Sequence, residues 1–92
     1  PSTQISRYSA DGKQAESILI NDENIIIFKF FRLLSENGNS LKYENWNYSK
    51  KHGLRCSYKS ISEENAQGLL TKTTIYWNDE LKSETNFSYT YF

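Results

Sequence analysis

The sequence is poor in the residues that build metal sites, disulfide scaffolds and membrane spans. Its 92 residues include one Cys, one His, one Pro, four Gly and no Met. One Cys cannot form an internal disulfide, and one Cys with one His cannot complete a tetrahedral zinc site. The longest apolar run, residues 25–28, is far shorter than the ~20 residues of a membrane span. We therefore expect no metal, no other cofactor and no membrane partner. The lone Cys favours a cytoplasmic location, with a trimmed secreted product left open.

Net charge is also absent, since 11 Lys and Arg balance 11 Asp and Glu. A protein that binds polyanions in general would carry more Lys and Arg than Asp and Glu. The charges are nevertheless segregated along the chain, with −1 over residues 1–39, +4 over residues 40–61 and −3 over residues 62–92. Such segregation can steer protein association without net charge. We expect a protein partner, and self-association through the +4 and −3 segments is a further interpretation.

Aromatic residues are abundant instead, with seven Tyr, five Phe and two Trp. Plentiful large apolar side chains at zero net charge are typical of a folded chain. The length suits one domain, because typical domains contain roughly 100–150 residues. Residues 1–92 are therefore expected to form a single compact domain with one core.

Most of the chain predicts antiparallel hairpins. Asp11-Gly12 is typical of a tight hairpin turn, because Gly accepts a positive φ. The second half of the chain alternates apolar and polar residues with a period of two, which indicates strands. The predicted hairpins pair residues 3–9 with 14–20, residues 40–48 with 54–59, and residues 69–77 with 81–91.

Residues 23–36 are predicted to form the one helix. Gly38 suits the position after a last helical turn. One helix face would carry Lys29, Arg32 and Glu36. As a strand, this segment would place Lys29 among apolar neighbours. The predicted fold is α+β, in the order ββ-α-ββ-ββ, with the helix packed on an antiparallel sheet of hairpins. The alternative is an all-β sandwich or barrel with residues 25–34 as a buried strand.

The candidate binding residues lie in the basic segment. They combine cations with large aromatic rings, and they are Lys42, Trp46, Tyr48, Lys50, Lys51, His52, Arg55 and Lys59. Aromatic and basic side chains often anchor protein interfaces, and they also stack on single-stranded bases. A bulge near Asn45 would instead turn Trp46 into the core, so its exposure stays open.

No catalytic arrangement stands out. Cys56 and His52 are four residues apart, which along a strand is roughly 13 Å and too far for activation of a thiolate. Cys56 is expected to be buried and His52 to lie exposed in a loop. We do not expect an enzyme. The predicted function is a small non-enzymatic protein-binding module, such as an inhibitor, an immunity-type protein or an adaptor. The alternative is a single-stranded nucleic-acid-binding domain that uses the basic aromatic hairpin 42–59.

Overall fold

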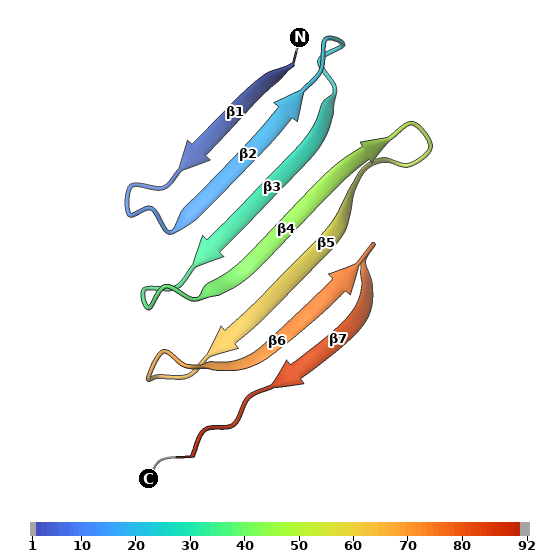
Figure 1. The fold of residues 1–92 in the computed structure, drawn as a ribbon. Coiled ribbons are helices and arrows are strands. Elements are labelled where there is room, and N and C mark those ends of the chain that lie inside the picture. Colours follow the sequence, from blue (N-terminus) through green and yellow to red (C-terminus); the bar gives the residue numbers. More distant parts are fainter. Residues whose placement is uncertain (1, 91–92) are drawn as a thin grey trace.

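The chain forms one antiparallel sheet of seven strands in the computed structural model, which describes residues 2–90. The strands are β1 (Thr3–Tyr8), β2 (Gln14–Ile20), β3 (Ile26–Leu34), β4 (Ser40–Ser49), β5 (Gly53–Glu64), β6 (Leu70–Trp77) and β7 (Glu80–Asn86). Each strand pairs with the next one along the chain (Figure 1). The pairing of the three predicted hairpins is confirmed as β1–β2, β4–β5 and β6–β7. However, β5 continues to Glu64 and β7 ends at Asn86, so residues 87–90, which were predicted as part of the last strand, lie outside it. The end of the last predicted strand, Tyr91, lies outside the described residues.

The predicted α+β fold is wrong, because the described residues contain no helix and residues 23–36 hold β3 between two turns. At the first turn, Asn24 has a φ of 63°, which a right-handed α-helix does not allow. The N–H groups of Glu23 and Ile25 donate to Asn21 Oδ1 at 2.9 and 3.1 Å. The all-β alternative has the right class. However, the strands form one open layer instead of a sandwich or a barrel.

Four of the hairpin turns share one sequence pattern. A Ser or Asn begins each turn, and a Gly or Asn with positive φ follows three residues later, at Gly12, Asn24, Gly38 and Gly68. In three turns the first side-chain oxygen accepts two backbone N–H groups, namely at Asn21, Ser35 and Asn65. These local bonds favour a turn over a helix. They explain why the chain reverses at both ends of β3.

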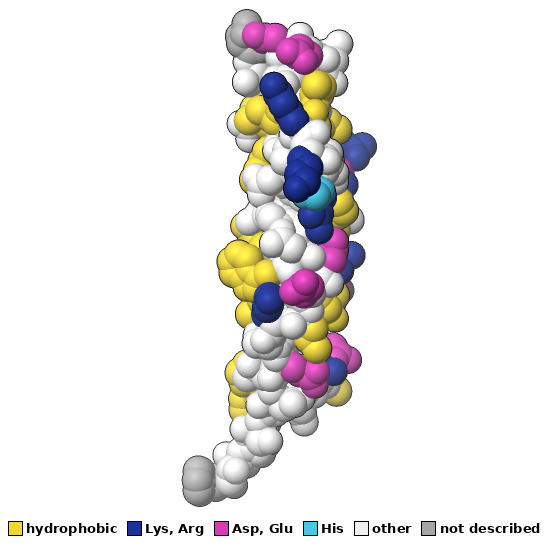
Figure 2. Space-filling model, turned by 90° about the vertical axis from the view of Figure 1, so that its right-hand side faces the viewer, with side chains coloured by type: hydrophobic (Ala, Val, Ile, Leu, Met, Phe, Trp, Pro, Cys, Tyr) yellow, Lys and Arg dark blue, Asp and Glu magenta, His cyan; other side chains and the backbone are white. Residues whose placement is uncertain are grey.

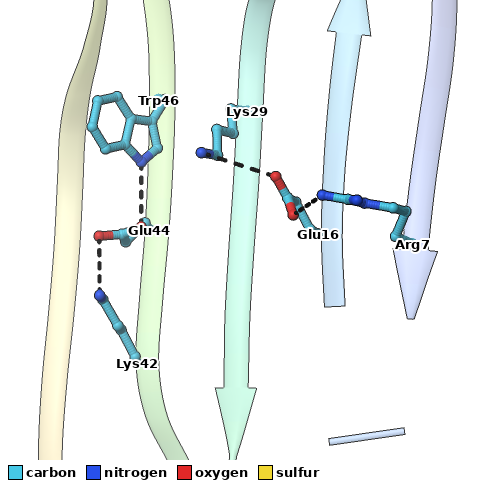
Figure 3. A network of polar contacts seen from close by, with 6 residues as sticks. All are labelled: Arg7, Glu16, Lys29, Lys42, Glu44 and Trp46. Carbon is cyan, nitrogen blue, oxygen red and sulfur yellow. Dashed lines mark hydrogen bonds and ion pairs between the residues drawn. The ribbon is translucent and has the colours of Figure 1, made fainter. Parts of the chain in front are cut away.

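The two faces of the sheet differ in chemistry. Successive side chains of a strand point to opposite faces, and directly paired residues share a face. We call the side that carries Phe30, Tyr43, Tyr58 and Trp77 the aromatic face. We call the opposite side, which carries the network drawn in Figure 3, the ion-pair face. Lys29 and Phe31 lie on the same face. This is possible because neither face of the sheet is buried in a core, so a charged side chain is tolerated on both.

The sheet is a single layer, 58 × 32 × 13 Å. Its radius of gyration is 16.1 Å, compared with about 12 Å for a compact chain of this length. Its accessible surface is 6658 Å², compared with roughly 5,500 Å² for a compact protein of this mass. Ala15 and Cys56 are the buried apolar residues, and no large side chain is fully buried among the described residues. The expected compact core therefore does not form there. Figure 2 shows the thin layer from one side, with hydrophobic side chains on both flanks.

Two turns at the same end of the sheet are bonded to each other. Asn39 Nδ2 donates to Glu64 Oε2 and to the Gly68 carbonyl oxygen, both at 2.7 Å. Asn37 Nδ2 donates to Glu64 Oε1 at 3.3 Å. The hydrogen bonds from Asn39, Ser35 and Asn37 lower the pKa of Glu64. The β3–β4 turn is thereby fixed to the β5–β6 turn, although β4 and β5 are joined at the other end.

Candidate interaction surface

A chain of polar contacts crosses β1 to β4 on the ion-pair face (Figure 3). Arg7 Nη2 lies 3.0 Å from Glu16 Oε2, and Lys29 Nζ lies 3.9 Å from Glu16 Oε1. Lys29 Nζ also lies 5.5 Å from the centre of the Trp46 ring. This distance is within the range of a cation–π contact. The carboxylate of Glu16 is therefore shared by two cations, one of which also contacts Trp46.

The same network continues on the far side of Trp46. Trp46 Nε1 donates to Glu44 Oε1 at 3.4 Å, and Lys42 Nζ lies 3.7 Å from Glu44 Oε2. Lys42 Nζ also lies 5.7 Å from the centre of the Phe31 ring. Trp46 is half-buried between these charged groups. The bulge expected near Asn45 of β4 lies instead in the neighbouring strand β5, opposite Asn45 and Trp46. It does not turn Trp46 into a core.

Four of the eight predicted binding residues lie together on the ion-pair face, namely Lys42, Trp46, Tyr48 and Lys59. Lys59 pairs with Glu44 across the strands, and its Nζ lies 4.8 Å from the centre of the Tyr76 ring. Arg55 pairs with Asn47 and therefore lies on the aromatic face. Lys50, Lys51 and His52 are exposed in the β4–β5 turn. The structure does not bring the eight residues onto one face.

A β-bulge in β5 separates Arg55 from Lys59. The pairing moves from Asn45–Tyr58 to Trp46–Cys56, which leaves Ser57 as an extra residue. Ser57 Oγ donates to the Asn45 carbonyl oxygen at 3.2 Å and lies 2.7 Å from Asn47 Nδ2, which donates to it. Strict alternation predicts Cys56 and Tyr58 on one face, and the bulge places them on opposite faces.

An aromatic row crosses β3 to β6 on the aromatic face. The ring centres of Phe30 and Tyr43 are 5.2 Å apart, those of Tyr43 and Tyr58 are 5.8 Å apart, and those of Tyr58 and Trp77 are 5.0 Å apart. All three pairs are edge-to-face, which is a favoured geometry. Trp77 closes the row and is 50% exposed. We refer to these four rings as the aromatic row.

The sequence interpretation missed this row because it assigned Phe30 to a helix. The available signal was one aromatic residue at matching positions in each of four consecutive strands. Once residues 26–34 are taken as a strand, Phe30 pairs with Asn45 and lies diagonal to Tyr43. The row then follows from ordinary hairpin register.

Arg32 and Arg55 are the cations within the aromatic face, and neither has an ion pair among residues 2–90. In the described chain, the buried side-chain polar atoms without a hydrogen bond are Arg32 Nε and Asn45 Oδ1. Both belong to residues of the aromatic face. At the start of β7, Glu80 and Lys82 form an ion pair at 3.2 Å. The polar groups of this face are therefore less completely paired than those of the ion-pair face.

Nucleophilic and metal chemistry find little support in the described residues. Cys56 is buried, as expected, and Cys56 Sγ donates to the Tyr58 carbonyl oxygen at 3.3 Å. Burial raises the pKa of the Cys56 thiol, and nearby Glu44 and Asp79 raise it further, so the reactive thiolate is disfavoured. No group of three acidic, His or Cys side chains in residues 2–90 could hold a metal ion. The described part of the chain also lacks a helix suited to crossing a membrane.

Two hollows lie on the ion-pair face beside β1 and β2. Their volumes are 230 and 220 Å³, and both are lined by Arg7 and Glu16. The smaller is completed by Ile5 and Ile18. Neither hollow includes a predicted binding residue. Because Arg7 and Glu16 are already paired, the hollows offer no unpaired charge to a small ligand.

Comparisons with known proteins give no relative. No family model, no curated protein and no solved structure matches the chain.

Proposed function

We propose that the chain is a small non-enzymatic protein-binding module and that a partner docks on its aromatic face. The observation that carries the proposal is the uncovered aromatic row, which no second layer of described residues covers. An antiparallel sheet commonly packs its more apolar face against a core and leaves the other face in water. In this chain, the missing layer would come from the partner.

The cost of removing water favours the aromatic face over the ion-pair face. Covering the ion-pair face would desolvate several charged side chains that already have partners. Glu16 binds Lys29, and Glu44 binds Lys42 and Trp46. Burial of such pairs costs more than their mutual attraction returns unless the geometry is excellent. The aromatic face presents rings, hydroxyl groups and two arginines. The water that a partner must displace from the aromatic face is therefore held less tightly than the water on the ion-pair face.

The charges of the aromatic face define the chemistry of the partner. Arg32 and Arg55 have no ion pair in the described chain, and a buried cation needs a partner charge. The partner surface should therefore be flat and apolar, with carboxylates opposite the two guanidinium groups. The exposed Lys50 and Lys51 lie in the turn next to Arg55. They would attract such an acidic partner before contact.

The sheet is large enough for a stable complex. Its outline of 58 × 32 Å is more than twice the roughly 800 Å² that each protein contributes to a standard interface. A partner that covers only the aromatic row and its neighbours would therefore suffice.

The two Trp residues provide a matched test because they lie on opposite faces. We expect Trp77→Ala to weaken binding by about 30-fold, which corresponds to a hot-spot loss of about 2 kcal/mol. We expect Trp46→Ala to change binding less than threefold. Proteins captured by the wild-type chain are purified and titrated against the wild type and both variants. Circular dichroism and thermal unfolding show that each variant is folded.

The result also tests the predicted contact role of Trp46. Binding that is lost in Trp46→Ala and retained in Trp77→Ala would assign docking to the ion-pair face and overturn the proposal. A partner that binds the wild type and both variants equally would overturn it as well. If the chain binds only single-stranded oligonucleotides, with an affinity that falls steeply as salt rises, the protein-binding proposal fails.

A further inference from the structure

The two outer strands of the sheet are protected to different degrees. β7 carries Glu80, Lys82 and Glu84, and its pairing with β6 is interrupted by a bulge. Charges and bulges on an edge strand hinder pairing with another chain. β1 has one charged residue, Arg7, which is held by Glu16 at 3.0 Å. Its register with β2 is unbroken from Thr3 to Tyr8. Of the two outer strands among the described residues, β1 is therefore the less protected.

The ladder shows which backbone groups of β1 point outward. The Ser9 N–H donates to the Gln14 carbonyl oxygen at 2.9 Å, so Ser9 faces β2. Hydrogen-bonded and non-hydrogen-bonded pairs alternate along an antiparallel ladder. The N–H and C=O groups of Gln4, Ser6 and Tyr8 must therefore point away from β2. No strand among the described residues pairs with this side of β1.

We propose that a second copy of this chain pairs with β1 in antiparallel orientation, with a twofold axis through Ser6. In this register, Ser6 lies opposite Ser6 of the second copy, and Gln4 lies opposite its Tyr8. All outward backbone groups of the three residues then find partners. The arrangement closes on itself because the same strand contributes from both copies.

The side chains are compatible with this register. Ser6 Oγ already lies 3.0 Å from Ser17 Oγ, and the Ser6–Ser6 pair extends this hydroxyl row across the twofold axis. Tyr8 is 72% exposed, and Gln4 of the second copy would partly cover its ring. Arg7 lies opposite Ile5, so no like charges meet. Pairing of β1 with β7 of another copy would instead meet the charges and the bulge of β7.

The pairing leaves the aromatic faces of both copies on the same side. The result is one continuous sheet of two copies, with the two aromatic rows available to partners. The contact is confined to two edge strands and is smaller than a standard interface, so association should be weak and depend on concentration. It does not require the proposed docking function, because Trp77 lies far from β1 in the strand order.

Substitutions that introduce a positive or a negative charge at Ser6 test the proposed register between the two copies of β1. Sedimentation equilibrium of the 92-residue chain should show a reversible dimer for the wild type. Ser6→Lys and Ser6→Glu should each weaken it by at least tenfold, because two like charges face each other across the axis. An equimolar mixture of the two variants should restore the dimer. Ser83→Lys on β7 is the matched control and should dimerise as the wild type does.

The restored mixture also shows that both variants are folded. A wild-type chain that stays monomeric at millimolar concentration overturns the proposal. A dimer that persists unchanged in Ser6→Lys, or that is lost in Ser83→Lys, overturns it by placing the contact elsewhere. Failure of the mixture to dimerise, with both variants folded by circular dichroism, rejects the register through Ser6.

Discussion

The contact between the two bonded turns can be measured through two glycines. Gly38 and Gly68 have φ values of 86° and 80°, so Ala at either position is strained by about 1–2 kcal/mol. A Cβ at Gly38 would meet nothing within 4 Å, whereas a Cβ at Gly68 would lie 2.5 Å from Asn37 Cγ. Asn37 would then have to leave its rotamer, at about 0.5–1.5 kcal/mol, and release Glu64. We expect Gly68→Ala to cost about 2–3 kcal/mol and Gly38→Ala about 1–2 kcal/mol.

Urea unfolding followed by tryptophan fluorescence measures both losses, provided that the slope m is unchanged. Asn37→Ala supplies the control, because without the Asn37 side chain Gly68→Ala should cost no more than Gly38→Ala. Equal losses for the two glycine variants in the wild-type background would refute the turn contact. A difference that persists in the Asn37→Ala background would do the same.

Three further outcomes are expected. A double-mutant cycle of Lys29→Ala and Trp46→Ala should give a coupling of about 0.5–1 kcal/mol by urea unfolding, and zero coupling would contradict the cation–π contact. Cys56 should react with a thiol reagent at pH 8 much more slowly in the folded chain than in urea, since burial raises its pKa; equal rates would show it exposed. The pKa of Glu64 is lowered from 4.5, so its stabilising effect is present above that pH and lost on acidification. The stability difference between wild type and Glu64→Gln should therefore shrink below about pH 4.5, and a difference independent of pH would reject the hydrogen bonds.

The sequence predicted hairpins well where turns and alternation agreed. Asp11-Gly12 and the alternation of residues 40–48 located β1, β2 and β4 to within one residue. β5, however, continues to Glu64, beyond its predicted end at residue 59. The prediction failed at β3, where Lys29 and Arg32 interrupt an apolar run. In a single-layer sheet both faces are accessible to solvent, so a charged side chain can lie beside aromatic side chains on either face. The alternation of apolar and polar residues is then lost in β3, and the spacing of Lys29, Arg32 and Glu36 happens to match one face of a helix.

The turns held a signal that would have corrected this error. Ser35 and Gly38 repeat the spacing of Ser9 and Gly12, and Asn21 and Asn24 follow it with Asn in place of Gly. The candidate site was predicted only in part for a similar local reason. The extra residue Ser57 in β5 places Arg55 on the opposite face of the sheet from Lys59. Neither composition nor periodicity predicts the position of a bulge.

Small-angle X-ray scattering of the dilute chain tests whether the described chain is one uncovered layer. The Cα radius of gyration of the structure is 16.1 Å, and we expect a monomer value of that size. The Ser6→Lys variant, measured in parallel, excludes a contribution from the proposed dimer. A value near 12 Å, as in a compact domain of this length, would mean that the chain covers its own aromatic face and is not a single open layer.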